Sequence, residues 1–121
     1  MRYLCMIHFD PKTLDALSTA EYEALMAEAL AYDDELRHGG HLVAAQRLEP
    51  PETATTLRMR DGHMTATDGP FAETKEQIGG FILLEARDLN DAIRLAARIP
   101  PARLGAVEVR PIMQRRGPAP A

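Results

Sequence analysis

Two apolar segments, residues 3–9 and 80–86, constrain the fold more than any other feature of the chain. They read YLCMIHF and GFILLEA, and neither alternates regularly between apolar and polar positions. A strand with one solvated face alternates, whereas a strand that is covered on both faces is apolar throughout. We therefore expect both segments to be strands of a sheet that is covered on each side.

Two amphipathic helices are predicted to accompany these strands. Ser18 and Glu21 have the spacing of a capping box, and apolar residues follow at intervals of three and four until the glycine pair at 39–40. Asp88 is the expected cap of a second helix, which the prolines at 100–101 end. The predicted inner face of this second helix consists of Leu89, Ala92, Ile93, Ala96 and Ala97.

The remaining strands complete a recognisable order of elements. Residues 55–60 and 63–67 alternate around an Asp-Gly pair, which predicts a hairpin with a type I′ turn. Residues 41–48 and 107–112 are predicted as two further strands. The fold class is therefore α+β, a ferredoxin-like βαββαβ unit with an inserted β-hairpin.

The predicted fold leaves one face of its sheet without a cover. Both helices of a ferredoxin-like unit lie on the same side, yet the two central strands are apolar on both sides. A second copy packed face to face would cover the other side. We therefore expect a homodimer that forms an α/β barrel.

Length and composition exclude several classes of protein. The 121 residues suit one domain, which we place at 1–113, followed by a flexible C-terminal tail at 114–121. A single cysteine allows no internal disulfide, so we expect a cytoplasmic protein. No apolar run approaches the roughly 20 residues of a membrane helix. The net charge of −4 and the absence of a basic stripe predict no direct contact with nucleic acid.

A long aperiodic connection carries the most specific motif of the chain. Residues 68–76 read DGPFAETKE, GGF follows at 79–81, and VEVRP stands at 107–111. These motifs resemble those of the DGPF-type proteins of the YCII-related family, over residues 2–113. The resemblance implies a dimeric ferredoxin-like barrel, in agreement with the pattern of apolar residues.

The resemblance implies less about activity. The wider group is similar to small dimeric barrels in which a histidine and an aspartate form a proposed acid/base pair, and one branch acts as a dehydrochlorinase. No histidine lies between Thr13 and Arg37 here, so that pair cannot be carried over to this chain. DGPF-type members often occur beside sigma factors of the extracytoplasmic-function class. This setting implies an alternative, a non-enzymatic accessory or regulatory domain with a transcription-factor partner.

Asp68 and His8 are the candidate catalytic residues. Asp68 is a base or ligand anchor if it stands at the mouth of the barrel, and a turn-forming residue if its carboxylate accepts backbone N–H groups two residues on. His8 shares a strand face with Leu4 and Met6, and its neutral pKa suits proton transfer. The alternative for His8 is a structural histidine at the end of a strand.

Candidate ligand-binding residues lie on the last strand and in the motif. Arg110 would clamp an anion with Glu108 holding it, or the two form a structural ion pair at the dimer interface. We expect this pair on the barrel side of the strand, with the intervening valines facing the helices. In the motif, Lys75 is a candidate cation and Glu73 a proton acceptor, or both belong to a solvated charge cluster. Phe71 is a ligand contact or a plug that packs the loop onto the sheet.

These assignments support a protein that binds a small anionic organic ligand in the barrel cleft, with acid/base, lyase-like chemistry as one outcome. Whether the chain is an enzyme is left open by its sequence. We predict no metal site, because no three histidine, cysteine or acidic residues have suitable spacing, and no cofactor, because phosphate-loop and dinucleotide motifs are missing. Cys5 is predicted to be a core residue and not a nucleophile.

Overall fold

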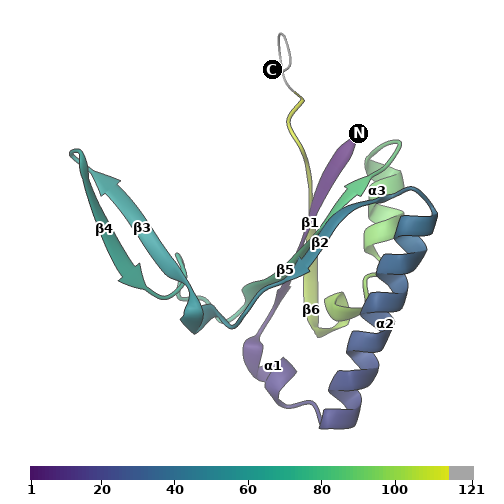
Figure 1. Cartoon of the computed structure of the whole chain (residues 1–121), viewed down its shortest axis with the longest axis horizontal. Helices are drawn as coiled ribbons and strands as arrows, with labels where there is room; N and C mark the ends of the chain where they lie inside the picture. Colours follow the sequence, from purple (N-terminus) through teal and green to yellow (C-terminus); the bar gives the residue numbers. More distant parts are fainter. Residues whose placement is uncertain (115–121) are drawn as a thin grey trace.

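The computed structural model describes residues 1–114, which form an antiparallel sheet with helices on one side and a separate hairpin (Figure 1). The four-stranded sheet has the order β2-β5-β1-β6. Its strands are β1 (Arg2–Phe9), β2 (Leu42–Arg47), β5 (Gln77–Glu85) and β6 (Gly105–Pro111). This order and the antiparallel pairing are compatible with a ferredoxin-like α+β fold.

The helices begin and end where their capping residues allow. In α2 (Thr19–His38) Ser18 and Glu21 form the predicted capping box, and the helix stops at Gly39, before Gly40 with its positive φ of 77°. Asp88 caps α3 (Leu89–Ala96) through the backbone N–H of Asp91. Two short 3-10 helices, η1 (Pro51–Thr53) and η2 (Pro100–Leu104), occupy connections.

A short helix, α1 (Pro11–Asp15), stands where the sequence predicts only the end of a strand. Asp10 accepts a hydrogen bond from the backbone of Lys12 at 3.0 Å, and Pro11 occupies the first helical position. Asp-Pro is a known start signal for a helix, because proline lacks only an N–H that would be unpaired there. The signal was therefore present in the sequence.

The core lies between the sheet and the two long helices. Alternate residues of β1 and β5 point toward the helices, as the two-residue period of a strand requires. Val107 and Val109 of β6 pack against the same cluster, as predicted. The side chains that are at most 2% exposed are Tyr3, Cys5, Leu36, Leu84, Ala92, Ala96 and Ile99.

The inner face of α3 differs from the prediction. Ala92 and Ala96 are buried as predicted, but Leu89 and Ile93 are 46% and 48% exposed and Ala97 is also exposed. Asp91 and Leu95, which were not predicted, are buried. The carboxylate of Asp91 accepts the backbone N–H of Arg87 at 3.0 Å, which turns this side of the helix toward the sheet. The prediction counted only apolar residues and therefore left out the buried carboxylate of Asp91. As a result, the predicted inner face of α3 was displaced around the helix from the observed one.

The opposite face of the sheet, which we call the open face, has no cover from residues 1–114 other than its own side chains. Leu4 is paired with Leu83, and Met6 with Phe81, across β1 and β5. All four side chains are half-buried because they pack against one another on the sheet surface. The expectation that both faces are covered therefore depends on a second copy, and the dimeric barrel stays a prediction.

Strands β3 (Thr55–Arg60) and β4 (His63–Asp68) pair only with each other and form a two-stranded ribbon. Asp61 and Gly62 both have positive φ, 49° and 78°, as a type I′ turn requires. In Figure 1 this hairpin projects away from the sheet, on the side opposite α2 and α3.

The connection between β4 and β5 is shorter than predicted, because β5 begins at Gln77 and not at Gly80. The shift of register between Ile7 and His8 on β1 accommodates one extra residue of β5.

None of the helices within residues 1–114 combines the length and the apolar content that membrane crossing demands. The predicted tail at 114–121 falls almost entirely outside the described residues.

Candidate functional site

Three polar side chains meet on the open face, at the boundary of β1 and β6. His8 Nε2 lies 3.3 Å from Glu108 Oε1, and Arg110 donates to the other carboxylate oxygen of Glu108. They share one face because Glu108 is the register partner of Met6, with His8 and Arg110 each two residues away. The hydrogen bond from Arg110 holds the pKa of Glu108 below its usual value, with a smaller effect of His8.

This cluster, which we call the His8 cluster, is partly open to water in the single chain. The side chains of His8, Glu108 and Arg110 are 28%, 41% and 68% exposed. The ring atom Nε2 of His8 is nevertheless buried and makes no hydrogen bond of good geometry with residues 1–114. Arg110 was expected to be buried both as an anion clamp and as part of a structural ion pair. In the single chain it is exposed.

Asp68 lies apart from the His8 cluster, at the base of the hairpin. Its register partner is Thr55, and its side chain is exposed. Its carboxylate accepts no hydrogen bond from a residue in 1–114, so the predicted turn with the backbone two residues on does not form. Instead the backbone closes here, because Gly69 N–H donates to the Ala54 carbonyl at 2.7 Å with φ of 107° at Gly69.

The other motif residues also lie away from the His8 cluster. Phe71 is 75% exposed and lies under the guanidinium of Arg58, 4.9 Å from its ring centre, so it does not plug the loop onto the sheet. Glu73 and Lys75 are exposed on the same connection. Its shape is held by Gln77, whose side-chain amide donates to the carbonyl oxygens of Ala72 and Thr74.

The sequence of the chain is similar to that of a known protein family. The family model of the YCII-related domain matches residues 1–116. An uncharacterized protein of Rhizobium meliloti (strain 1021) is 36% identical over 114 residues, which cover 93% of this chain and 92% of that protein. The chain belongs to the YCII-related family. The resemblance seen in the sequence is confirmed at this level, and the assignment to its DGPF-type members stays a prediction.

A cleft of this YCII-related chain lies at the end of the sheet beside α1 and the start of α2. Its volume is about 850 Å³, and none of the predicted site residues lines it. Its walls combine apolar and polar side chains, and the charged residues among them are one arginine and three acids. Contributing side chains include Phe9, Leu14, Tyr22, Leu25, Met26, Leu48 and Ile78.

Two glycines of β5 that line the cleft allow close packing of their neighbours. Gly79 lies against the ring of Phe9, and a β-carbon built at Gly79 would stand 2.3 Å from that ring. A β-carbon at Gly80 would stand 2.9 Å from the carbonyl oxygen of Gln46 on β2. The GG pair of the motif therefore has a packing role, which its sequence alone did not assign.

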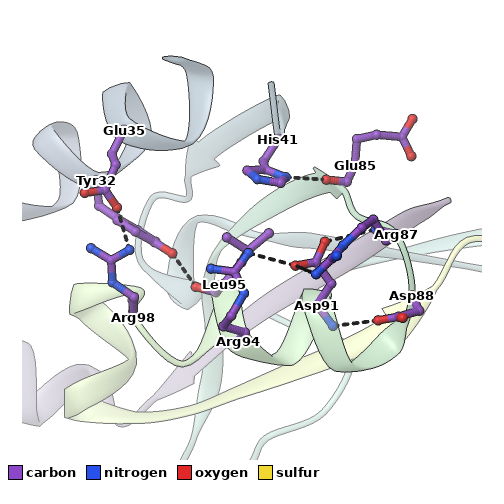
Figure 2. A network of polar contacts seen from close by, with 10 residues as sticks. All are labelled: Tyr32, Glu35, His41, Glu85, Arg87, Asp88, Asp91, Arg94, Leu95 and Arg98. Carbon is purple, nitrogen blue, oxygen red and sulfur yellow. Dashed lines mark hydrogen bonds and ion pairs between the residues drawn. The ribbon is translucent and has the colours of Figure 1, made fainter. Parts of the chain in front are cut away.

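A second polar network surrounds the buried carboxylate of Asp91, at the start of α3 (Figure 2). Arg94 donates to it at 2.7 Å, and Arg87 lies 3.5 Å away. The hydrogen bond from the Arg87 backbone, then that from Arg94, holds the pKa of Asp91 far below its usual range. This network fixes the start of α3 and borders a shallow depression of about 510 Å³ with His41 and Glu85.

Sequence reasoning missed Asp91 and the cleft for different reasons. The spacing of Asp88 and Asp91 is that of a capping box, so the signal for a second capping carboxylate was present. The cleft is assembled from five separate segments, and no local pattern predicts it. Among residues 1–114, no three histidine, cysteine or acidic side chains converge as metal ligands.

Proposed function

We propose that the protein is a homodimer that binds a small anionic organic ligand on the open face, between the two copies, with acid/base chemistry as its reaction type. The observation that carries the proposal is the contact of 3.3 Å between His8 Nε2 and Glu108 Oε1. Polar side chains in mutual contact beside apolar residues of a sheet face are typical of a binding pocket.

The cluster has the chemical parts for this task. The guanidinium of Arg110 offers a planar pair of donors for a carboxylate or phosphate ligand. Glu108, bonded to Arg110, places a carboxylate oxygen 3.3 Å from Nε2 of His8. The other ring nitrogen of His8 is then the atom that would exchange a proton with the ligand.

A second copy would supply what the single chain lacks. Packing on Leu4, Met6, Phe81 and Leu83 would remove water from the surroundings of Arg110 and strengthen its attraction to an anion. Of the motif residues, Asp68, Glu73, Lys75 and Phe71 lie off the end of the sheet. In this proposal they contribute to the pocket only where the dimer brings that end over the open face.

A thermal-shift screen of small carboxylates and phosphates tests the ligand. We expect at least one compound class to raise the Tm of the wild type and of Arg103→Gln, and to lose that effect in Arg110→Gln and His8→Gln. Arg103 is a suitable control because it is an exposed arginine paired with Glu28 on the helix side. Equal shifts in the Arg110 and Arg103 variants would place binding elsewhere and overturn the proposal.

A second measurement separates binding from catalysis. For each compound that shifts the Tm, the mixture is followed by NMR for release of a leaving group or for exchange of a carbon-bound proton with deuterium. Turnover in the wild type that is lost in His8→Gln while binding remains supports acid/base chemistry. Binding without turnover limits the function to a ligand-binding domain.

A further inference from the structure

The depression at the start of α3 collects two arginines around one buried carboxylate. The side chain of Asp91 is 1% exposed, and Nη2 atoms of Arg87 and Arg94 lie 3.5 Å and 2.7 Å from its Oδ1 atom. The two guanidinium groups reach the carboxylate from two sides (Figure 2). Because they share one oxygen atom of a buried side chain, they are held beside each other.

The carboxylate of Asp91 does not need both arginine side chains. Its Oδ2 atom accepts the backbone N–H of Arg87 at 3.0 Å, and its Oδ1 atom accepts from the guanidinium of Arg94 at 2.7 Å. The guanidinium of Arg87 approaches Oδ1 only to 3.5 Å, beyond a normal hydrogen bond, and its side chain is 82% exposed. Since each guanidinium has five N–H donors, most donors of this pair are not used by Asp91. The pair therefore has the capacity to bind a second anion.

The depression carries a net positive charge in an acidic chain. The carboxylate of Glu85 on its rim lies 2.7 Å from the α-amino group of Met1, which compensates its charge. With histidine neutral, the remaining formal charges among the lining residues are Arg87 and Arg94 against Asp91. The chain as a whole has a net charge of −4. A local excess of positive charge in a concave surface favours an anionic ligand.

His41 adds a third polar group with a defined tautomer. Its Nδ1 atom lies 2.9 Å from the backbone carbonyl oxygen of Glu85. A carbonyl oxygen only accepts hydrogen bonds, so Nδ1 carries the proton and Nε2 is left for another partner. His41 lines the depression together with Arg87 and Arg94. Its Nε2 atom accepts from a protonated ligand oxygen or, in the imidazolium form, donates to an ionised one.

We propose that this depression binds the phosphate group of a small phosphorylated compound, with Arg87 and Arg94 as paired donors and His41 as the third partner. Three groups from separate positions suit a tetrahedral anion with three free oxygens, whereas the planar fork of one arginine already satisfies a carboxylate. The volume of about 510 Å³ exceeds that of a phosphate group, so the depression also has room for the rest of the ligand. All of these residues belong to one chain and none to the His8 cluster, so the site is independent of the proposed function.

A titration with methyl phosphate, followed by heteronuclear NMR of the backbone amides of the full chain, tests the site. We expect saturable shifts that centre on His41, Arg87 and Asp91. Acetate, a small carboxylate, should bind at least tenfold more weakly. Shifts that are absent or centre elsewhere would overturn the proposal. Equal affinities for the two ligands would overturn the assignment to phosphate.

Arg87→Gln is the most informative variant, because it removes a guanidinium and keeps the backbone N–H that donates to Asp91. We expect the dissociation constant for methyl phosphate to rise at least tenfold, since a charge-assisted hydrogen bond is lost. Arg103→Gln is the charge-matched control, because Arg103 is paired with Glu28 and does not line the depression. Its dissociation constant should equal that of the wild type. An unchanged constant in Arg87→Gln would overturn the proposal.

Arg110→Gln separates this site from the open face. We expect this variant to bind methyl phosphate with the dissociation constant of the wild type, because Arg110 does not line the depression. Weaker binding in Arg110→Gln, with unchanged binding in Arg87→Gln, would place the phosphate on the open face. That result would keep the proposed function and overturn the second site. Weaker binding in Arg87→Gln alone supports the second site whether or not the protein is a dimer.

Discussion

The hydroxyl of Tyr32 on α2 donates to the backbone carbonyl of Leu95 on α3, with 2.5 Å between the oxygens. The ring of Tyr32 lies below the guanidinium of Arg98, whose charge is paired with Glu35 at 2.7 Å (Figure 2). Residues 63 positions apart in the sequence thereby join the two helices over the sheet. Burial raises the pKa of the Tyr32 hydroxyl, so the group remains a donor throughout the neutral range.

Tyr32→Phe is expected to lower the free energy of unfolding by about 1.5 kcal/mol, because it leaves the Leu95 carbonyl without its partner. Tyr22→Phe is the matched control, since Tyr22 lies on the same helix, is 41% exposed, and its hydroxyl donates no hydrogen bond to a residue in 1–114. Urea titrations of both variants measure the difference. Equal stability of the two variants would contradict the role assigned to this hydrogen bond.

Asp91→Asn is expected to lower the Tm by several degrees at pH 7. The folded-state pKa of Asp91 is depressed, so its ionised form stabilises the fold above the unfolded-state pKa of about 3.9. That contribution declines as the pH falls below this value toward the folded pKa. The difference in Tm between wild type and variant should therefore be constant from pH 8 to 6 and shrink below about pH 4.

Gly105→Ala is expected to cost more stability than Gly79→Ala. A β-carbon at Gly105 would stand 2.1 Å from the backbone carbonyl oxygen of His8, which cannot move without breaking the β1–β6 ladder. At Gly79 the obstacle is the side chain of Phe9, which can rotate. We expect losses of about 3 and about 1 kcal/mol. Phe9→Leu should restore stability to the Gly79 variant and not to the Gly105 variant.

Asp68→Ala is expected to change the free energy of unfolding by no more than about 0.5 kcal/mol, because its exposed carboxylate accepts no hydrogen bond from residues 1–114. Thr56→Val at the same end of the hairpin should cost more, since its hydroxyl donates to the Gly69 carbonyl at 2.8 Å. Differential scanning calorimetry compares the two. A destabilised Asp68→Ala would contradict the exposed, unbonded position of this carboxylate.

Cys5 is expected to react with a thiol reagent only on unfolding. The side chain is completely buried, and burial raises the pKa of its thiol to about 11, so little thiolate exists at pH 8. The labelling rate in native buffer should equal the opening rate of the core and should rise to that of a free thiol in denaturant. Rapid labelling of the native protein would contradict this burial.

Most elements of the fold could be predicted from local sequence patterns. The capping box at Ser18, the type I′ turn at Asp61 and the alternation of Val107 and Val109 each depend on residues close together in sequence. Such signals act through backbone hydrogen bonds and side-chain direction, which neighbouring residues control. The same reasoning failed for α3, because the burial of Asp91 depends on arginines that apolar periodicity does not count.

The candidate site was only partly accessible to such reasoning. The two-residue period of a strand predicted that Glu108 and Arg110 lie on one face of β6. The same period predicted which face of β1 carries His8. Their contact required the pairing of β1 with β6, about 100 residues apart. Asp68 and Phe71 were grouped with them because they belong to one motif, whereas the hairpin carries its base away from the open face.

The sequence by itself determined the family, the order of strands and helices, and which side of each strand is apolar, because these depend on local chemistry that a linear pattern records. Only the tertiary structure decided that His8 faces Glu108, that Asp91 is buried, and that a cleft forms beside α1. The reason is that each of these results from chain segments brought together by packing, and the free energy of that packing belongs to no single segment.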